Sequence, residues 1–313
     1  MTKIFAGRSN PKLSGEIAEE LGIPLGDITI KTFSDGEIWV KFEENIRNED
    51  VFIIQSTNPP SDNIIELLLM LDAARRSSAA SVTALIPYYG YARQDRKDLP
   101  RVPISARLFL DTFEAVGASR IVTMDLHSPQ IQGFVNIPFD HLYSRLVLLE
   151  RLRKEGLNEK DGVVLSPDMG SARMGQAYAR YLDIGFALID KRRPAPNRAE
   201  VVHLVGDLRD RHVLIIDDMV DTAGTIISAA ETARENGALS VAAVATHALF
   251  SGSACERLQQ APIDHIIVTN TVDFQSGNLE NKLEVISVAK IFAASIKRIT
   301  EGQSLSSLFE LEG

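Results

Sequence analysis

Two adjacent acids and a run of small and hydroxyl-bearing residues stand together in Val213–Ile226, which reads VLIIDDMVDTAGTI. An apolar run of strand length ends at Ile216, and the carboxylates Asp217 and Asp218 follow it. In an open α/β sheet, ligands bind at the carboxyl ends of the strands. A carboxylate in that place can accept hydrogen bonds from a vicinal diol. Two adjacent acids at the end of a buried strand are costly without partners, so the pair indicates a ligand site.

The loop after these acids has the composition of an anion site. Its residues are small or carry short polar side chains, and a helix is expected to begin at its end: Asp221, Thr222, Ala223, Gly224 and Thr225. Free N–H groups at a helix start bind anions, and small residues let a phosphate approach the backbone. A phosphate beside a diol indicates a phosphorylated sugar. The structural alternative is an ordinary helix whose Asp and Thr side chains serve as caps.

Three further segments carry residues that could do chemistry. Phe33–Glu37 (FSDGE) is a turn by composition, because Asp-Gly favours chain reversal, and a plain hairpin explains it equally well. Tyr91–Lys97 follows an apolar run and holds three cations within five residues, which suits a triphosphate or simply a solvated loop. Lys191 and its neighbours Arg192 and Arg193 form a basic triplet after another such run, with a basic surface patch as the alternative.

Short apolar runs alternate with segments of helical period along the chain. The runs are rich in Val and Ile and lack strict alternation, as strands covered on both faces do. Expected strands are 28–32, 51–55, 82–87, 120–124, 163–165, 186–189, 213–216, 241–246 and 265–269. Expected helices are 64–77, 106–116, 142–153, 172–181 and 225–236. This order predicts an α/β protein with parallel sheets flanked by helices.

An internal repeat refines the prediction. The segments that start at Val51 and Val213 both read apolar strand, polar loop, Ala-rich helix, small-residue turn and a second strand opened by Ser-Val. We infer two similar α/β domains, residues 1–145 and 146–313, the second carrying the Asp221–Thr225 loop. Chance similarity between two common strand–helix–strand units is the alternative.

Composition sets limits on the class of protein. The chain has 313 residues, a length typical of two domains, and 45% of them are hydrophobic, which argues against disorder. The single cysteine excludes an internal disulfide framework and is compatible with a reducing compartment. We expect a cytoplasmic protein, because the most apolar segment, Ile64–Leu71, is far too short to span a bilayer. A net charge of −9 disfavours nucleic acid but not local phosphate sites.

Six motifs in order along the chain resemble the ribose-phosphate pyrophosphokinases, also called phosphoribosyl pyrophosphate synthetases. They are FSDGE, IPYYGYARQDRK, DLHSPQIQGF, SPD, IDKRRP and DDMVDTAGT. The resemblance implies two domains of the type I phosphoribosyltransferase fold and agrees with the repeat. It implies transfer of the β,γ-diphosphoryl group of ATP to the anomeric hydroxyl of ribose 5-phosphate, which gives phosphoribosyl pyrophosphate and AMP. It also implies Mg²⁺ and a homohexamer.

The resemblance assigns roles to particular residues. ATP would be bound by residues of the first half: Phe33, Asp35, Gly36, Glu37, Arg93 and Gln94. Ribose 5-phosphate would be bound by residues of the second half: Arg193, Asp217, Asp218, Asp221, Thr222, Ala223, Gly224 and Thr225. Lys191 and Arg193 would be catalytic, His127 and Asp168 would form the metal site, and Lys97 and Arg101 would belong to a closing catalytic loop.

The sequence departs from the family pattern at two places. Leu99 stands where many members carry an arginine, which puts closure of the catalytic loop in doubt. DMGSARM has Ser171 for a glycine and Met174 for an arginine, which puts the backbone near Asp168 in doubt. Two other functions therefore stay open: a phosphoribosyltransferase that consumes phosphoribosyl pyrophosphate, and a non-catalytic regulatory paralogue of a synthetase.

Overall fold

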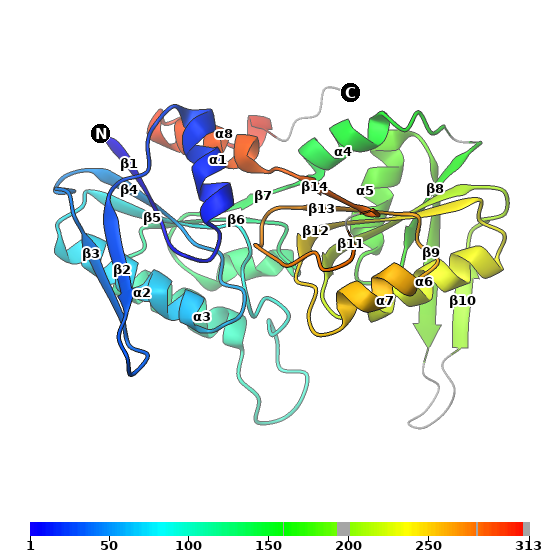
Figure 1. Ribbon diagram of the computed structural model, residues 1–313, viewed down its shortest axis with the longest axis horizontal. Helices are drawn as coiled ribbons and strands as arrows, with labels where there is room; N and C mark the ends of the chain where they lie inside the picture. The colour runs from blue at the N-terminus through cyan, green and yellow to red at the C-terminus, as the bar shows by residue number, and fades with distance from the viewer. Residues whose placement is uncertain (159, 193–200, 280, 309–313) are drawn as a thin grey trace. The chain divides into compact units, whose positions relative to one another are not determined.

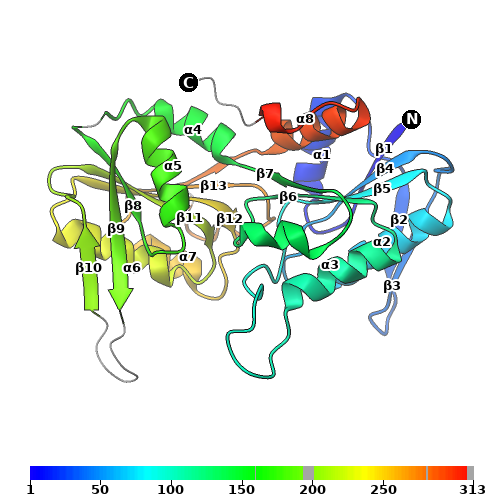
Figure 2. The ribbon, with the colours of Figure 1, turned by 180° about the vertical axis from the view of Figure 1, so that it is seen from behind.

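The computed structural model describes residues 1–158, 160–192, 201–279 and 281–308, and it divides into two compact units. The first unit contains Met1–Ser144 with Thr271–Asp273 and the segment from Ser287 onward. The second contains Arg145–Asn270 and Phe274–Ile286. Each unit has a parallel sheet with helices on both faces, so the expected α/β class is confirmed (Figures 1 and 2).

The first unit is built on five parallel strands. Their order is β1 (Thr2–Ala6), β4 (Asp50–Ile54), β5 (Ser81–Ile86), β6 (Arg120–Met124) and β7 (Phe139–Leu142). Helices α1 (Pro11–Leu21) and α8 (Ala289–Thr300) lie on one face, and α2 (Asp62–Arg76) and α3 (Ser105–Val116) lie on the other (Figure 1). A hairpin of β2 (Ile28–Thr32) and β3 (Ile38–Phe42) packs beside α2. A 3-10 turn, η1 (Pro129–Phe134), follows β6, and another, η2 (Ser306–Leu308), follows α8.

The second unit has a seven-stranded sheet that is parallel except at one edge. The order is β10 (Val201–Val205), β9 (Gly185–Arg192), β8 (Gly162–Ser166), β11 (His212–Val220), β12 (Ser240–Ala248), β13 (His265–Thr269) and β14 (Leu283–Ile286). Only the edge strand β10 runs antiparallel, against β9. Helices α4 (Arg145–Arg153) and α5 (Ala172–Leu182) cover one face, and α6 (Gly224–Glu235) and α7 (Ala254–Gln260) cover the other (Figure 1). Each unit has its own apolar core.

The two repeated segments form the same strand–helix–strand unit. In the first unit, β4 and β5 are parallel neighbours joined through α2, with Val51 opposite Val82. In the second unit, β11 and β12 are parallel neighbours joined through α6, with Val213 opposite Val241. The apolar strands and Ala-rich helices expected from the repeat are thus formed in both halves of the chain.

The end of the chain is grouped differently from the expected 146–313 domain. Helix α8 belongs to the first unit, where it packs against α1. Its buried face carries Ile291, Phe292 and Ile296, and the Ser287 hydroxyl donates to the Glu16 carboxylate on α1 (2.5 Å). The short segment Thr271–Asp273 joins the same unit, where the Thr271 carbonyl accepts from Ser56 Oγ (2.7 Å). The apolar face of α8 and the hydrogen bonds of Ser287 and Thr271 together attach the end of the chain to the first unit.

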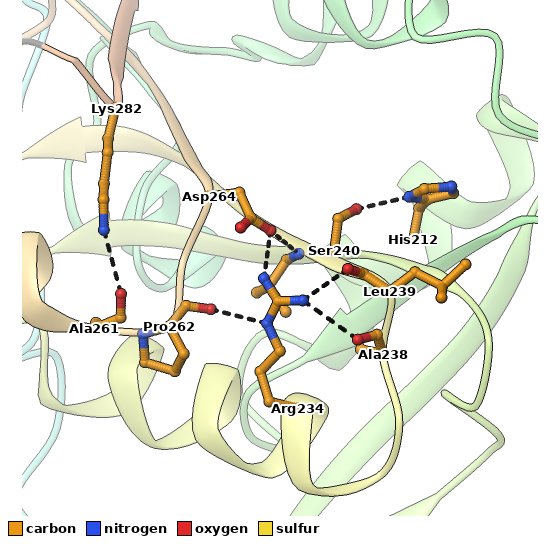
Figure 3. A network of polar contacts seen from close by, with 10 residues as sticks. His212, Arg234, Ala238, Leu239, Ser240, Ala261, Pro262, Asp264 and Lys282 are labelled. Atoms are coloured by element: carbon orange, nitrogen blue, oxygen red, sulfur yellow. Dashed lines mark hydrogen bonds and ion pairs between the residues drawn. The ribbon is translucent and has the colours of Figure 1, made fainter.

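A network of hydrogen bonds centred on Arg234 links the amino ends of β12 and β13 in the second unit (Figure 3). Arg234, near the end of α6, donates to the carbonyls of Leu239 (2.7 Å) and Pro262 (3.3 Å). It also pairs with Asp264 (2.5 Å), whose carboxylate accepts from the Val241 N–H (2.8 Å). This end of the sheet is therefore fixed by internal hydrogen bonds. Among the described helices, none has both the length and the apolar character needed to cross a membrane.

Candidate functional site

The paired acids lie inside a strand rather than after it. We expected the strand to end at Ile216, but β11 continues to Val220 because it keeps pairing with β12 beyond that point. Its pairing with β8 stops at Ile215, opposite Leu165. Asp217 and Asp218 thus occupy the part of β11 that extends past the end of β8, at the carboxyl edge of the sheet.

Asp217 lies near two other acids, Asp218 and Asp168, whose charges affect its ionisation. The pKa of Asp217 is raised well above its ordinary value by burial, then by the charges of Asp218 and Asp168. Asp218 itself is buried, and its N–H donates to Asp217 Oδ1 (3.0 Å). Three carboxyl groups at one sheet edge favour a ligand that brings hydroxyl donors or a cation.

The loop 221–225 presents an open helix start. Ala223 adopts the left-handed conformation (φ 64°) and is buried, and α6 begins at Gly224. Ala223 occupies the N-cap position, so neither an Asp nor a Thr caps the helix from that position. The first N–H groups of a helix have no intrahelical acceptor, which makes such a helix start suited to binding an anion. Thr222 and Thr225 are exposed beside them.

Asp168 lies two residues beyond β8, in the turn that leads to α5. Its Oδ1 accepts from the Ser171 N–H (3.1 Å), and Ser166 Oγ donates to its carbonyl (3.0 Å). Ser171 has φ −86°, a conformation open to any residue, and its hydroxyl lies 2.8 Å from that of Ser166. The serine is therefore accommodated without backbone strain, and it adds a hydroxyl to the turn that holds Asp168.

In the first unit, the FSDGE segment forms the tip of the β2–β3 hairpin. The Phe33 N–H donates to the Glu37 carbonyl (2.8 Å), and Asp35 Oδ1 accepts from the Glu37 N–H (3.0 Å). Gly36 has φ 97°, which side chains rarely adopt. The Phe33 ring is 50% exposed, so the turn presents an aromatic face and two carboxylates to solvent.

The loop after β5 is tied to the loop after β6. Gln94 Oε1 accepts from Ser105 Oγ (2.6 Å) at the start of α3. Asp95 accepts from Ser128 Oγ and from Gln130 Nε2 (3.0 Å). Because Ser128 follows His127, these contacts bring the segment of Arg93 and Gln94 beside that of His127. Both segments lie at the carboxyl ends of neighbouring strands.

His127 is exposed, and the residues around it are held by backbone contacts. Asp125, two residues before His127, accepts at Oδ2 from the Ser144 N–H (3.0 Å). The Leu126 N–H donates to His141 Nε2 (2.9 Å). Sequence reasoning missed His141. Its place in β7, next to β6, is the only signal that would have linked it to this loop.

The remaining predicted residues fall into two groups. Lys97 and Arg101 are exposed in the loop before α3, where Arg101 has φ 68° and Leu99 is 63% exposed. Lys191 lies in β9, opposite Val202 of β10, and Arg193 lies outside the described residues.

The fit to magnesium depends on few protein ligands. Across the described ranges, no group of three or more His, Cys, Asp or Glu side chains is arranged to hold a metal ion. Mg²⁺ prefers oxygen ligands and keeps several waters, and it commonly binds through one or two carboxylates plus substrate phosphates. Asp168, which lies close enough to Asp217 to raise its pKa, fits such a sparse site, in which nucleotide phosphates supply further ligands.

Comparison with known proteins covers almost the whole chain. Residues 2–117 match the N-terminal domain of ribose phosphate pyrophosphokinase, and residues 191–310 match the phosphoribosyl synthetase-associated domain. Ribose-phosphate pyrophosphokinase of Chlorobaculum tepidum is 50% identical over 308 residues, which are 98% of this chain and 95% of that protein. The chain belongs to the ribose-phosphate pyrophosphokinase family. The enzyme of that name from Aquifex aeolicus is 49% identical over 98% of both chains.

The family also has a solved structure with this fold. The crystal structure of phosphoribosylpyrophosphate synthetase from Mycobacterium smegmatis matches with a TM-score of 0.90 and 38% identity. The match covers 96% of this chain and 99% of that one. The resemblance seen in the six motifs is thereby confirmed at the level of family and fold.

Proposed function

We propose that this chain transfers the β,γ-diphosphoryl group of ATP to ribose 5-phosphate. The anomeric oxygen attacks the β-phosphorus, the bond from that phosphorus to the α-phosphate oxygen breaks, and AMP leaves. The hydroxyl proton is released, and phosphoribosyl pyrophosphate forms. The near-full-length match to ribose-phosphate pyrophosphokinases is the observation that carries this proposal.

The sugar phosphate is assigned to the second unit. The 5-phosphate binds the open start of α6, with the N–H groups of 223–225 and the hydroxyls of Thr222 and Thr225 as donors. Asp217 and Asp218 accept hydrogen bonds from the ribose hydroxyls, and Asp221 belongs to the same loop. Hydrogen bonds from the ligand hydroxyls would stabilise the ionised form of Asp217, whose pKa is raised by burial and by the charges of Asp218 and Asp168.

The nucleotide is assigned to the first unit. Phe33 stacks on the adenine, and Asp35 and Glu37 of the same turn accept from the base or its ribose. Arg93 and Gln94 contact the phosphates, and Lys97 and Arg101 close over them. Gly36 permits the tight turn that presents Phe33, Asp35 and Glu37.

Transfer itself depends on positioning and on fixed positive charge. Lys191 and Arg193 stabilise the charge that develops on the transferring group. His127 and Asp168 would hold Mg²⁺ with the nucleotide. The ion would neutralise phosphate charge as a Lewis acid. A homohexamer and a cytoplasmic location follow from resemblance and composition, and both stay predictions.

An assay for AMP formation from ATP and ribose 5-phosphate, with and without Mg²⁺, tests the proposal. We expect AMP only with both substrates and the ion. A phosphoribosyltransferase would instead consume phosphoribosyl pyrophosphate with a base and form no AMP. A regulatory paralogue would be inactive alone and would co-purify with an active synthetase. The intact motifs from Lys191 to Thr225 favour the active enzyme.

A further inference from the structure

Arg257 reaches the ribose-phosphate loop from a neighbouring helix. It lies on α7, which packs beside α6 (Figure 1). Its Nη1 donates to the Thr222 carbonyl at 2.8 Å. Its Nη2 lies 3.8 Å from the position that a Cβ on Gly224 would occupy. None of the motifs that assigned the phosphate site includes this arginine.

The hydrogen bond to Thr222 controls the direction of an N–H group. The carbonyl of Thr222 and the N–H of Ala223 belong to one planar trans peptide, so they point in opposite directions. When Arg257 holds the carbonyl on the side of α7, the Ala223 N–H is turned away from α7. That N–H is the first donor of the open start of α6.

The backbone conformation of Ala223 requires support from neighbouring groups such as Arg257. Ala223 has φ 64°, in the left-handed region that residues with a Cβ rarely adopt. Residues in strained conformations persist only where the surroundings determine them. The chain after β12 supplies part of this, because the Ser251 N–H donates to the Asp221 carbonyl (3.0 Å). Buried Leu258 anchors α7 in the core, which fixes the place from which Arg257 reaches the loop.

We propose that Arg257 is a positioning residue for ribose 5-phosphate, which sets the Ala223 peptide so that its N–H faces the 5-phosphate. The inference rests on the proposed function, because it concerns the phosphate site assigned there. The Arg257 guanidinium also places a positive charge beside the loop, which favours binding of the 5-phosphate.

Titration calorimetry of the full chain with ribose 5-phosphate tests the inference. Arg257→Met keeps the aliphatic stem and removes the donors, and we expect about tenfold weaker binding, as for loss of one charge-assisted hydrogen bond at an exposed site. Arg257→Lys should recover part of the loss. Arg180→Met, on an exposed arginine of α5, serves as the matched control and should bind as the unmodified protein does.

Kinetics separate positioning from a general structural role. We expect the KM for ribose 5-phosphate to rise about tenfold in Arg257→Met, with the KM for ATP and the unfolding temperature unchanged. Unchanged affinity for ribose 5-phosphate, or an equal rise in both KM values with a lower unfolding temperature, would overturn the inference. Failure of the unmodified protein to bind ribose 5-phosphate would instead contradict the proposed function.

Discussion

The carboxylates at the edge of the second sheet are arranged for a ligand at the expense of stability. Burial and the charges of Asp218 and Asp168 raise the pKa of Asp217. A raised pKa in the folded state means that ionisation of the group destabilises the fold. The cost is sensible only if these groups are needed for binding, because function and stability compete at such sites.

Asp217→Asn should make the protein without ligand more stable and weaken its binding of ribose 5-phosphate. The favourable contribution of the protonated wild-type group is complete below the unfolded-state pKa of about 3.9, and it is lost as the pH rises through the folded-state pKa. The gain in unfolding temperature should therefore be absent in acid and grow toward neutral pH. Each kcal/mol relieved corresponds to about 2–4 °C.

Calorimetric scans of both proteins between pH 4 and 8 measure this difference. Asp72→Asn, on an exposed acid of α2 paired with Arg76, is the control and should show no such rise with pH. A gain in stability that is constant with pH would show that ionisation of Asp217 does not destabilise the fold.

Lys191→Ala should lower turnover by roughly two to three orders of magnitude, since it removes one fixed charge donor to the transferring group. Binding of ribose 5-phosphate should change much less. Steady-state rates of AMP formation check this, with Lys160→Ala, on an exposed lysine of the same unit, as the control. Near-normal turnover in Lys191→Ala would remove this lysine from the mechanism.

Phe33→Ala should raise the KM for ATP roughly 5- to 100-fold, as expected for loss of one aromatic stacking contact with a base. Phe33→Trp should retain most of the affinity. Phe33 is 50% exposed at the tip of a hairpin, so the unfolding temperature should change little. Initial rates at varied ATP give the answer, and an unchanged KM in Phe33→Ala would place the adenine elsewhere.

At the scale of elements, the two ends of the second sheet have separate tasks. The carboxyl ends carry Asp168, Asp217 and the loop before α6, while the amino ends are joined by the Arg234 network (Figure 3). The carboxyl end carries the proposed ligand-binding groups, and the amino end is held by internal hydrogen bonds.

Arg234→Ala should lower the free energy of unfolding by about 2–3 kcal/mol, because it leaves Asp264 and several carbonyls without a charged donor. Both KM values should stay as they are, since the network lies at the opposite end of the strands from the site. Denaturant unfolding measures the loss. Arg76→Ala, which breaks an exposed pair with Asp72, should cost under about 0.5 kcal/mol. Equal losses in the two variants would contradict a special role for the network.

The apolar strands and Ala-rich helices at the centre of each unit were predictable because hydrophobic runs in a sequence indicate buried elements directly. Edge elements were missed. β7 and β14 are only four residues long, and β7 includes Asp140 and His141 among its residues. The extension of β11 through Asp217 was missed as well, since only pairing with β12 keeps two acids in a strand. The left-handed Ala223 and the reach of Arg257 depend on tertiary contacts that no local pattern encodes.

At the scale of the whole molecule, the chain returns to the first unit after completing the second. Helix α8 has a regular apolar face, but its sequence does not state which sheet it covers. Its partner, α1, lies more than 250 residues away along the chain. A domain boundary drawn by sequence position alone therefore places residues 287–308 in the second domain, whereas they group with the first unit.

The proposed site residues divide between the units by substrate. Those assigned to ATP, together with His127, lie in the first unit, and the described ones assigned to ribose 5-phosphate, together with Asp168, lie in the second. The proposed reaction joins these two substrates and moves two phosphoryl groups as one.

Phosphorus NMR of a reaction with ATP, ribose 5-phosphate and Mg²⁺ tests that claim most directly. We expect equal amounts of AMP and phosphoribosyl pyrophosphate, with the β- and γ-phosphorus signals of ATP appearing together in the diphosphate on C1. Formation of ADP with a singly phosphorylated sugar product, or no consumption of ATP by folded protein, would contradict it.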